Sequence, residues 1–343
     1  MWKTMELYKT LIGKRVNRDI FSSNGILLMP AGAEITYDHL VTLEKHGIIL
    51  TRHDVAGDAP APAAPFSHEA AIEEAVKHVS QVFDEIRETR KIPITDLRRD
   101  VIPMVHEAAI STNLIDLFAS LQAKDDYTYR HNIAVGAIST LIGKWMGLDP
   151  KELMQLTTAA LLHDAGKMLV PEEILNKPGK LTDEEYEIMK SHTVLGYNLL
   201  KETVGLNERQ ALVALQHHER LDGSGYPYGI KEDKIDLFSR IVMVADIYHA
   251  MTSPRVYRGA SPFYEVLDQM DKDSFGTLDP QITRTFVHKI MNGLIGRTVV
   301  LTDDREGTIM LIHPHDPLRP LVKTGGDYID LSKDSSVHIK KIH

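Results

Sequence analysis

The sequence predicts a mainly α-helical protein, in which a helical domain lies between a small N-terminal α+β module and a small C-terminal β-rich module. Three observations indicate this architecture. Residues 100–295 keep apolar side chains at three- and four-residue steps, which is the period of a helix face. Residues 56–67 alternate proline with alanine, which is typical of an extended linker. Residues 296–343 contain short β-branched runs between turn residues, which favours strands.

The N-terminal module covers residues 1–55. Lys14–Ile20 and Gly25–Leu28 are predicted to form short strands, and Tyr37–His46 has helical spacing. After the linker, residues 68–99 are predicted to form a connecting helix. Its apolar stripe consists of Ile72, Val76, Val79, Val82, Phe83 and Ile86. This stripe, around residues 70–90, either pairs with a second copy in a homodimer or docks within the same chain, because the spacing fits both.

The helical domain, residues 100–295, is predicted to contain eight long helices and few strands. They are Val101–Ala119, Thr128–Trp145, Pro150–Lys167, Thr182–Lys201, Glu208–His218, Leu237–Met251, Pro262–Met270 and Pro280–Met291. The C-terminal module, residues 296–343, is predicted to form a small β-barrel or meander. Its strands are Arg297–Leu301, Gly307–Ile312, Leu321–Lys323, Tyr328–Leu331 and Val337–Ile342.

The composition excludes some classes of protein. The 343 residues carry a net charge of -9, whereas a protein that holds a long nucleic acid needs a basic stripe. A small anionic ligand stays compatible, since a metal centre or a few cations can bind it. The chain has no run of about 18 apolar residues to span a bilayer, no apolar secretory signal at its start and no cysteine. We therefore expect a cytoplasmic protein without a membrane span.

His163 and Asp164 are the first candidates for metal binding. In the predicted helix Pro150–Lys167, both lie at the inner, C-terminal end. A buried and unpaired aspartate is costly, and a cation bound by both side chains would remove that cost. For this pair taken alone, the alternative is a His–Asp hydrogen bond inside the core, without a metal.

Five more residues occupy inward or helix-end positions: His131, His192, His217, His218 and Asp246. A single histidine on an apolar helix face is more often a core residue than a ligand. His217 and His218 are adjacent, so their side chains diverge by about 100° and can reach one metal from two directions, or two metals. Asp246 lies in an almost wholly apolar run and needs a counter-charge.

Together, five histidines and two aspartates predict a metal site. Imidazole and carboxylate ligands suit Fe, Mn, Zn or Co better than Ca or Mg. Seven ligands are too many for one tetrahedral ion, so we expect two divalent metals. A bridging aspartate and a bridging hydroxide would then serve the hydrolysis of a phosphate ester, because the metals also polarise the phosphate oxygens.

The residues stand in motifs that resemble the HD-GYP family, a branch of the HD phosphohydrolases. The matching segments are Leu161–Lys167 (LLHDAGK), Ser191–His192, Gln216–Gly229 (QHHERLDGSGYPYG), Ser239–Asp246 (SRIVMVAD) and Thr252–Arg258 (TSPRVYR). The likeness covers roughly residues 120–295 and includes the triplet Gly225-Tyr226-Pro227. It implies an HD-type helical bundle with a two- or three-metal centre that hydrolyses cyclic di-GMP, through linear pGpG, towards GMP.

The resemblance also implies roles for individual residues. The metal ligands are His131, His163, Asp164, His192, His217, His218 and Asp246, and the catalytic residues are His163, Asp164 and Lys167. The residues that bind substrate are Lys167, Tyr226, Arg255 and Arg258. Lys167 lies one helical turn beyond His163, so its ammonium could reach a metal-bound phosphate. Without the resemblance, the lysine and the arginines could equally be solvated, and the turn could be an ordinary one.

Two positions depart from the family's pattern. Members with a third metal carry an acid four residues before the first histidine, where this chain has Tyr127; Asp126 points about 100° away. We therefore expect two metals and no third. His249 stands where the family usually has an acid, three residues after Asp246. It is either oriented towards Asp246 as a supporting residue or a surface substitution.

The sequence thus predicts a cyclic di-GMP phosphodiesterase that uses a metal-bridging hydroxide, with iron as the expected metal and manganese as the second choice. One alternative is a hydrolase of another nucleotide, such as cyclic GMP-AMP or a nucleotide phosphate. Another is a sensor or scaffold that binds a cyclic dinucleotide without cutting it. Cyclic di-GMP is the expected partner, and the two flanking modules are candidates for binding regulatory proteins.

Overall fold

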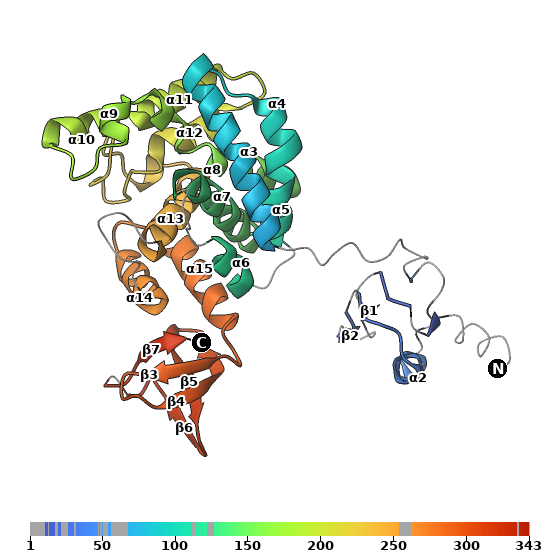
Figure 1. Ribbon diagram of the computed structural model, residues 1–343. Coiled ribbons are helices and arrows are strands. Elements are labelled where there is room, and N and C mark those ends of the chain that lie inside the picture. Colours follow the sequence, from blue (N-terminus) through green and yellow to red (C-terminus); the bar gives the residue numbers. More distant parts are fainter. Residues whose placement is uncertain are drawn as a thin grey trace. The chain divides into compact units, whose positions relative to one another are not determined.

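The computed structural model describes residues 11–12, 14–17, 20–21, 27–30, 32–46, 48, 50, 54–55, 68–110, 114–121, 127–253, 262–334 and 336–342. The chain divides into two compact units, Met1–Phe66 and Ser67–His343 (Figure 1). Each unit has a buried apolar core of its own. No helix within the described ranges is both long enough and apolar enough to cross a membrane.

The described residues of the N-terminal unit include a two-stranded antiparallel sheet and the helix α2. Strand β1 (Ile20–Phe21) pairs with β2 (Leu27–Met29), and helix α2 spans Tyr37–Lys45. The predicted helix is confirmed. The predicted strand Lys14–Ile20 is too long, because its residues at 15 and 16 make only isolated bridges, to Glu34 and Val55.

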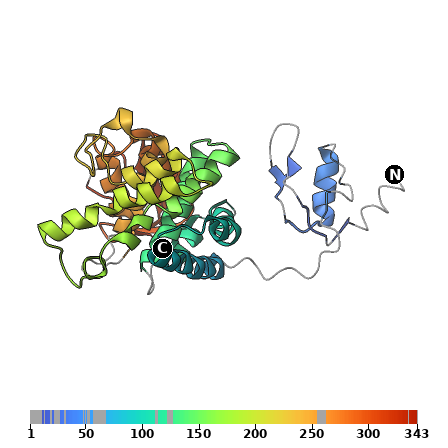
Figure 2. The same cartoon turned by 90° about the horizontal axis from the view of Figure 1, so that it is seen from above.

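The second unit is mainly helical, as predicted (Figures 1 and 2). Its helices are α3 (His68–Thr89), α4 (Ile94–Asp96), η1 (Leu97–Val101), α5 (Ile102–Ile110), α6 (Leu114–Leu121), α7 (Tyr127–Trp145), α8 (Pro150–Leu161), η2 (Ala165–Leu169), α9 (Glu172–Leu175), α10 (Asp183–Lys190), α11 (His192–Glu202), α12 (Glu208–Gln216), η3 (Glu232–Lys234), α13 (Leu237–Thr252), α14 (Phe263–Asp273) and α15 (Pro280–Asn292). Helix α7 packs against α3, α5, α8 and α13, so that residues 130–143 are all buried. It forms the centre of the bundle.

Two of the predicted helices are interrupted within the described residues. Pro150–Lys167 is wrong as one helix, because α8 ends at Leu161 and η2 begins only at Ala165. Thr182–Lys201 is two helices, α10 and α11, separated at Ser191. The prediction Val101–Ala119 covers the end of η1, α5 and α6, and residues 111–113 lie outside the described residues. At the first break, the ring of His163 bonds the carbonyl of Ala160 at 2.7 Å. That carbonyl would otherwise accept the next helical N–H, so the ring competes with the helix.

The apolar stripe of α3 is used within the chain. Its six residues, from Ile72 to Ile86, are at most 5% exposed and belong to the core of the helical unit. Helix α3 packs against η1, α5, α6 and α7. Intrachain docking, one of the two alternatives, therefore accounts for the stripe, and the stripe no longer indicates a homodimer.

A five-stranded antiparallel sheet follows the last helix, as the predicted meander requires. Its strands are β3 (Thr298–Leu301), β4 (Glu306–His313), β5 (Asp316–Thr324), β6 (Asp327–Asp330) and β7 (Ile339–Ile342), in the order β6-β5-β4-β3-β7. Val299, Ile309 and Val322 are fully buried and join the core of the helices. The hydroxyl of Tyr264 on α14 also donates to the carbonyl of Leu318 on β5. The sheet thus packs directly on the helical bundle.

Candidate metal centre

Asp164 lies at the centre of a buried cluster of imidazoles. It follows α8 in the turn before η2, and its side chain is 2% exposed. Its Oδ2 atom lies 3.5 Å from Nε2 of His163 and 3.8 Å from Nε2 of His131. Its Oδ1 atom lies 3.4 Å from Nε2 of His192 and 3.7 Å from Nε2 of His217. One carboxylate therefore stands between two groups of imidazoles, with one oxygen facing each group.

Asp246 and His218 complete the cluster. Asp246, on α13, has Oδ1 at 3.2 Å from Nε2 of His131 and Oδ2 at 4.0 Å from Nδ1 of His218. The ring of His218 lies 4.1 Å from that of His217, centroid to centroid. The structure thus brings together all seven residues that the sequence selected as ligands. Two sets among them present donor atoms within 4.8 Å of one another: Asp164, His192, His217 and His218, and then His131, His163 and Asp164.

Three of the histidines are oriented in the same way by helix ends. Each Nδ1 bonds the carbonyl three residues earlier: His163 to Ala160 at 2.7 Å, His192 to Met189 at 2.7 Å and His217 to Ala214 at 3.0 Å. Since a carbonyl only accepts, each Nδ1 carries the hydrogen. Each Nε2 therefore turns a lone pair towards Asp164, which is how ligating imidazoles are held.

Burial and charge set the protonation states of the cluster. Burial lowers the pKa of His163 to about 4 and that of His192 to about 3. Burial opposes ionisation of Asp164, but Lys167 and His163 still hold the pKa of that carboxyl well below its usual range. For Asp246, a hydrogen bond and the charge of His131 likewise overcome burial and lower the pKa. Neutral imidazoles and ionised carboxylates are the forms that bind cations.

The donor set fits divalent transition metals. Nε2 of His163 and Oδ1 of Asp164 are buried and have no hydrogen-bond partner among the residues that the structure describes. A buried polar atom without a partner costs roughly 1–3 kcal/mol, or more for a charged one. Metal ions between the two imidazole groups would supply that partner. Five imidazoles and two carboxylates match the ligands of Fe, Mn, Zn or Co.

Comparisons with known proteins place these residues in a family. The sequence model of the HD domain matches residues 114–282. A cyclic di-GMP phosphodiesterase of Pseudomonas aeruginosa is 32% identical over 277 residues, which are 76% of this chain and 66% of that protein. These matches span the metal cluster and the Gly225-Tyr226-Pro227 triplet. The chain belongs to the HD-GYP family.

Two more similarities describe this HD-GYP chain. A 3′3′-cGAMP-specific phosphodiesterase of Vibrio cholerae is 37% identical over 194 residues, or 55% of this chain and 43% of that protein. A solved HDG"Y"P protein of Bdellovibrio bacteriovorus has a TM-score of 0.54 and 18% identity, with 82% of this chain and 97% of that chain covered. The last likeness concerns the fold alone. The chain spans less than two thirds of the length of the two phosphodiesterases, 66% and 43%.

The HD-GYP loop places Tyr226 over the cluster. The ring of Tyr226 stacks on His218, with centroids 4.6 Å apart and planes 28° apart. Buried Glu219 holds the loop by accepting from the backbone N–H groups of Tyr228 and Ile230, at 2.9 and 3.1 Å. A Cβ atom on Gly225 would lie 2.4 Å from the backbone of Glu219, so this approach requires glycine. Sequence reasoning did not single out Glu219, although a carboxylate inside the Gln216–Gly229 motif was a signal for it.

The remaining predicted residues have different outcomes. Lys167 donates from Nζ to Oδ2 of Asp164 at 2.6 Å, so its ammonium reaches the edge of the cluster. Arg255, Arg258 and Asp126 lie outside the described residues. Tyr127 begins α7, one helical turn before His131.

His249 supports a different ligand from the one expected. It is 3% exposed, and its Nδ1 lies 2.9 Å from Nδ1 of His131 rather than against Asp246. When Nε2 of His131 serves as a metal ligand, its Nδ1 must carry the hydrogen and donates to His249. Nε2 of His249 then donates to Oγ of Ser253 at 3.1 Å. His249 is therefore a buried acceptor that orients His131, and not a surface substitution.

We expect His249→Leu to weaken metal binding about 10- to 100-fold, because His131 loses the acceptor that fixes its ring. His249→Gln, which can still accept through its side-chain oxygen, should retain most of the affinity. Metal titration with a competing chelator measures both. Equal affinities for the two variants would show that the hydrogen bond to His131 has no role.

The cluster also predicts how stability depends on pH. In the metal-free chain, His163 takes up its proton near pH 4 when folded and near 6.5 when unfolded. Protons thus favour the unfolded chain, so the stabilisation is complete above about pH 6.5 and is lost as the pH falls towards 4. We expect a loss of about 2 to 3 kcal/mol between about pH 7.5 and 4.5 from this group. Urea denaturation at the two pH values tests this, and His163→Gln should flatten the dependence.

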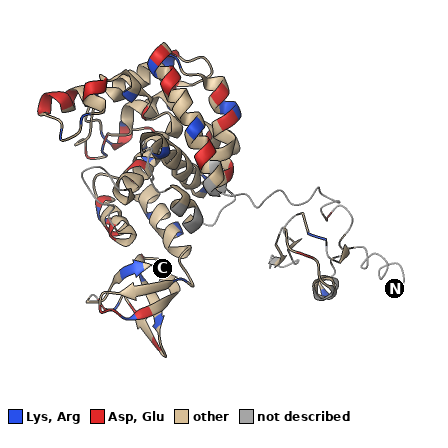
Figure 3. Cartoon of the chain, in the orientation of Figure 1, with Lys and Arg blue, Asp and Glu red and all other residues tan. Residues whose placement is uncertain are grey.

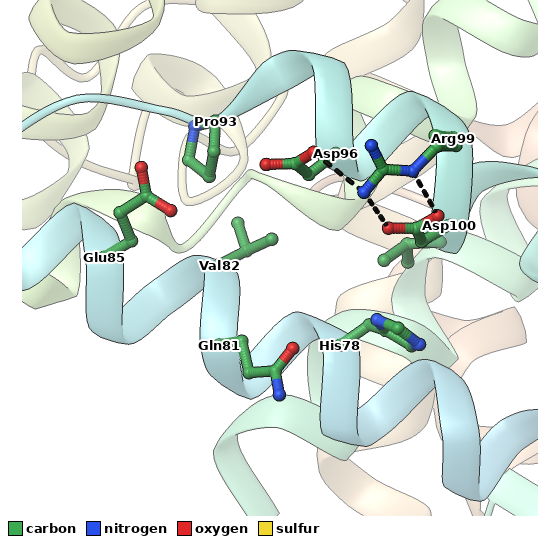
Figure 4. A pocket seen from close by; sticks show the side chains of 9 residues that line it. His78, Gln81, Val82, Glu85, Pro93, Asp96, Arg99 and Asp100 are labelled. Carbon is green, nitrogen blue, oxygen red and sulfur yellow. Dashed lines mark hydrogen bonds and ion pairs between the residues drawn. The ribbon is translucent and has the colours of Figure 1, made fainter.

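A separate polar groove of about 310 Å³ lies between α3 and the segment formed by α4 and η1 (Figure 4). On the α4 and η1 side, Arg99 pairs with Asp100 at 2.7 Å and with Asp96 at 2.9 Å. None of the residues that line it belongs to the metal cluster. Asp96, Arg99 and Asp100 are therefore paired with one another.

Proposed function

We propose that the chain is a metal-dependent phosphodiesterase that hydrolyses cyclic di-GMP to pGpG or GMP. The observation that carries the proposal is the position of Asp164, whose two oxygens each face a separate group of imidazoles. A carboxylate in this position can bridge two metal ions. The related phosphodiesterase of Pseudomonas aeruginosa, named for cyclic di-GMP, supports the choice of substrate.

The proposed centre holds two divalent metals, iron first and manganese second. His131 and His163 would bind one metal with Oδ2 of Asp164, and His192 and His217 would bind the other with Oδ1. His218 and Asp246 would complete the set. Such a pair supplies an activated water for attack on phosphorus and stabilises the charge that develops on the phosphate oxygens.

The chain's own residues perform the remaining tasks. Lys167 lies at the rim with its side chain 26% exposed, so its ammonium can leave Asp164 and donate to a phosphate oxygen. Tyr226 closes one side of the site through its stacking on His218. Arg255 and Arg258 are proposed to bind the guanine and phosphate. Residues 100–295 would form the hydrolytic domain, and residues 1–55 and 296–343 would bind regulatory partners.

The second candidate is hydrolysis of a cyclic GMP-AMP dinucleotide, which the relative from Vibrio cholerae supports by its name. A sensor that binds without cutting is the third. Seven converging donor groups argue against the sensor, because binding alone does not require a metal-activated water.

Turnover by the purified chain tests the proposal. The chain is loaded anaerobically with Fe²⁺ or Mn²⁺, and cyclic di-GMP, cyclic GMP-AMP and GTP are offered side by side, with products separated by chromatography. We expect pGpG or GMP from cyclic di-GMP at the highest kcat/KM. If a chain with two bound metals cleaves none of these substrates, both hydrolase proposals are wrong and the sensor is the remaining candidate. A preference for cyclic GMP-AMP would replace the proposed substrate.

A further inference from the structure

An exposed aromatic side chain on α10 lies next to the metal centre. Tyr186 is 47% exposed, and its ring meets that of Tyr226 edge to face, with centroids 6.4 Å apart. Tyr226 in turn stacks on His218 at 4.6 Å. A continuous path of rings therefore leads from the cluster to the surface at Tyr186.

A lysine lies beside both tyrosine rings. The Nζ atom of Lys190 is 5.3 Å from the ring centroid of Tyr186 and 5.7 Å from that of Tyr226. It pairs with Glu187 at 2.5 Å, but the side chain of Glu187 is 69% exposed. Such exposed pairs contribute little, so the ammonium remains available to an anion.

The two ends of α10 differ in charge. The first turn carries Asp183, Glu184 and Glu185, which Figure 3 shows as an acidic end of the helix. Lys190 is the last residue of α10, two positions before His192 of the cluster. Lys190 therefore lies at the end of α10 that adjoins the cluster, and Tyr186 lies about one helical turn before it.

We propose that Tyr186 and Lys190 form a base-binding subsite of the metal centre. One purine base of the substrate stacks on the Tyr186 ring, since exposed aromatic rings bind bases by their faces. Lys190 faces the phosphate of the cyclic dinucleotide that is not being cleaved. This inference rests on the proposed function, because it takes a cyclic dinucleotide as the ligand. It adds that the affinity for the substrate depends on its purine base and on Tyr186 and Lys190 of α10.

Binding of two uncleaved ligands tests the subsite. The metal-loaded full chain is titrated calorimetrically with GMP and with ribose 5-phosphate, which has the same phosphate and no base. We expect GMP to bind more tightly. Tyr186→Ala should weaken GMP about tenfold and leave ribose 5-phosphate unchanged. Tyr186→Phe, which keeps the ring face, should behave like the unmodified chain.

The C-terminal sheet offers a matched control. Tyr328 on β6 is 59% exposed and has Lys323 at 5.9 Å from its ring, so it repeats the tyrosine–lysine chemistry on the sheet, apart from α10 (Figure 1). Tyr328→Ala should leave the affinity for GMP unchanged. The subsite is overturned if the unmodified chain does not prefer GMP, or if Tyr186→Ala and Tyr328→Ala bind GMP equally well.

Turnover separates this inference from the proposed function. With cyclic di-GMP, Tyr186→Ala and Lys190→Gln should each raise KM about tenfold, at unchanged metal content. If the unmodified chain cleaves cyclic di-GMP and both variants keep its KM, only the subsite is wrong. If it does not cleave cyclic di-GMP and still prefers GMP through Tyr186, only the proposed function is wrong.

Discussion

Asp164→Ala is expected to lower kcat for cyclic di-GMP by at least about a thousandfold, because metal ions contribute several kcal/mol to phosphate hydrolysis. The substitution removes both oxygens that stand between the imidazole groups, so neither group keeps its shared carboxylate. It also leaves Lys167 without its 2.6 Å partner. Steady-state turnover and metal content per chain, measured on the same preparation, give the two readouts.

Two controls make the result for Asp164 interpretable. Circular dichroism should show an unchanged helix content, since Asp164 lies in a turn and not inside a helix. Asp233→Ala, at an exposed carboxylate in η3, should leave both turnover and metal content unaltered. Full activity of Asp164→Ala would contradict the assignment of the whole cluster.

Gly166→Ala is expected to destabilise the fold by about 3 kcal/mol or more and to displace a ligand. A Cβ atom at this position would lie 2.0 Å from the backbone oxygen of His192 and 2.5 Å from the backbone nitrogen of Gly196. Both contacts are backbone, so α11 must move away from η2, and His192 moves with it. Denaturant unfolding should show the loss, and bound metal should fall below two ions per chain.

Gly276→Ala is the matched control for Gly166→Ala. A Cβ atom at Gly276 meets no heavy atom within 4 Å. Its stability and metal content should therefore stay close to those of the unmodified chain. If both variants unfold at the same denaturant concentration, the close approach of η2 to α11 is not what holds His192.

The sequence was sufficient for the type and approximate position of most long helices of the helical unit, but not for their number. Helix caps are local, and they occur where they were expected, as in the capping box from Thr182 to Glu185. The interruptions were not visible in the periodicity. At Ser191 the hydroxyl bonds the carbonyl of Ile188 at 2.6 Å, and at His163 the ring bonds Ala160. Both are choices of side-chain rotamer, on which apolar spacing has no influence.

By itself, the sequence indicated that five polar residues lie at inward or helix-end positions and need partners: His163, Asp164, His217, His218 and Asp246. His131 and His192 depended more on the family resemblance. Periodicity reports burial, because a helix face is read from one segment at a time. Which buried groups meet depends on contacts between segments far apart in the chain, so only the tertiary structure decided this. It placed Asp164 between two imidazole groups and brought His249 into hydrogen-bond contact with His131. It also placed the Tyr186 ring of α10 against the ring of Tyr226, which stacks on His218 of the cluster.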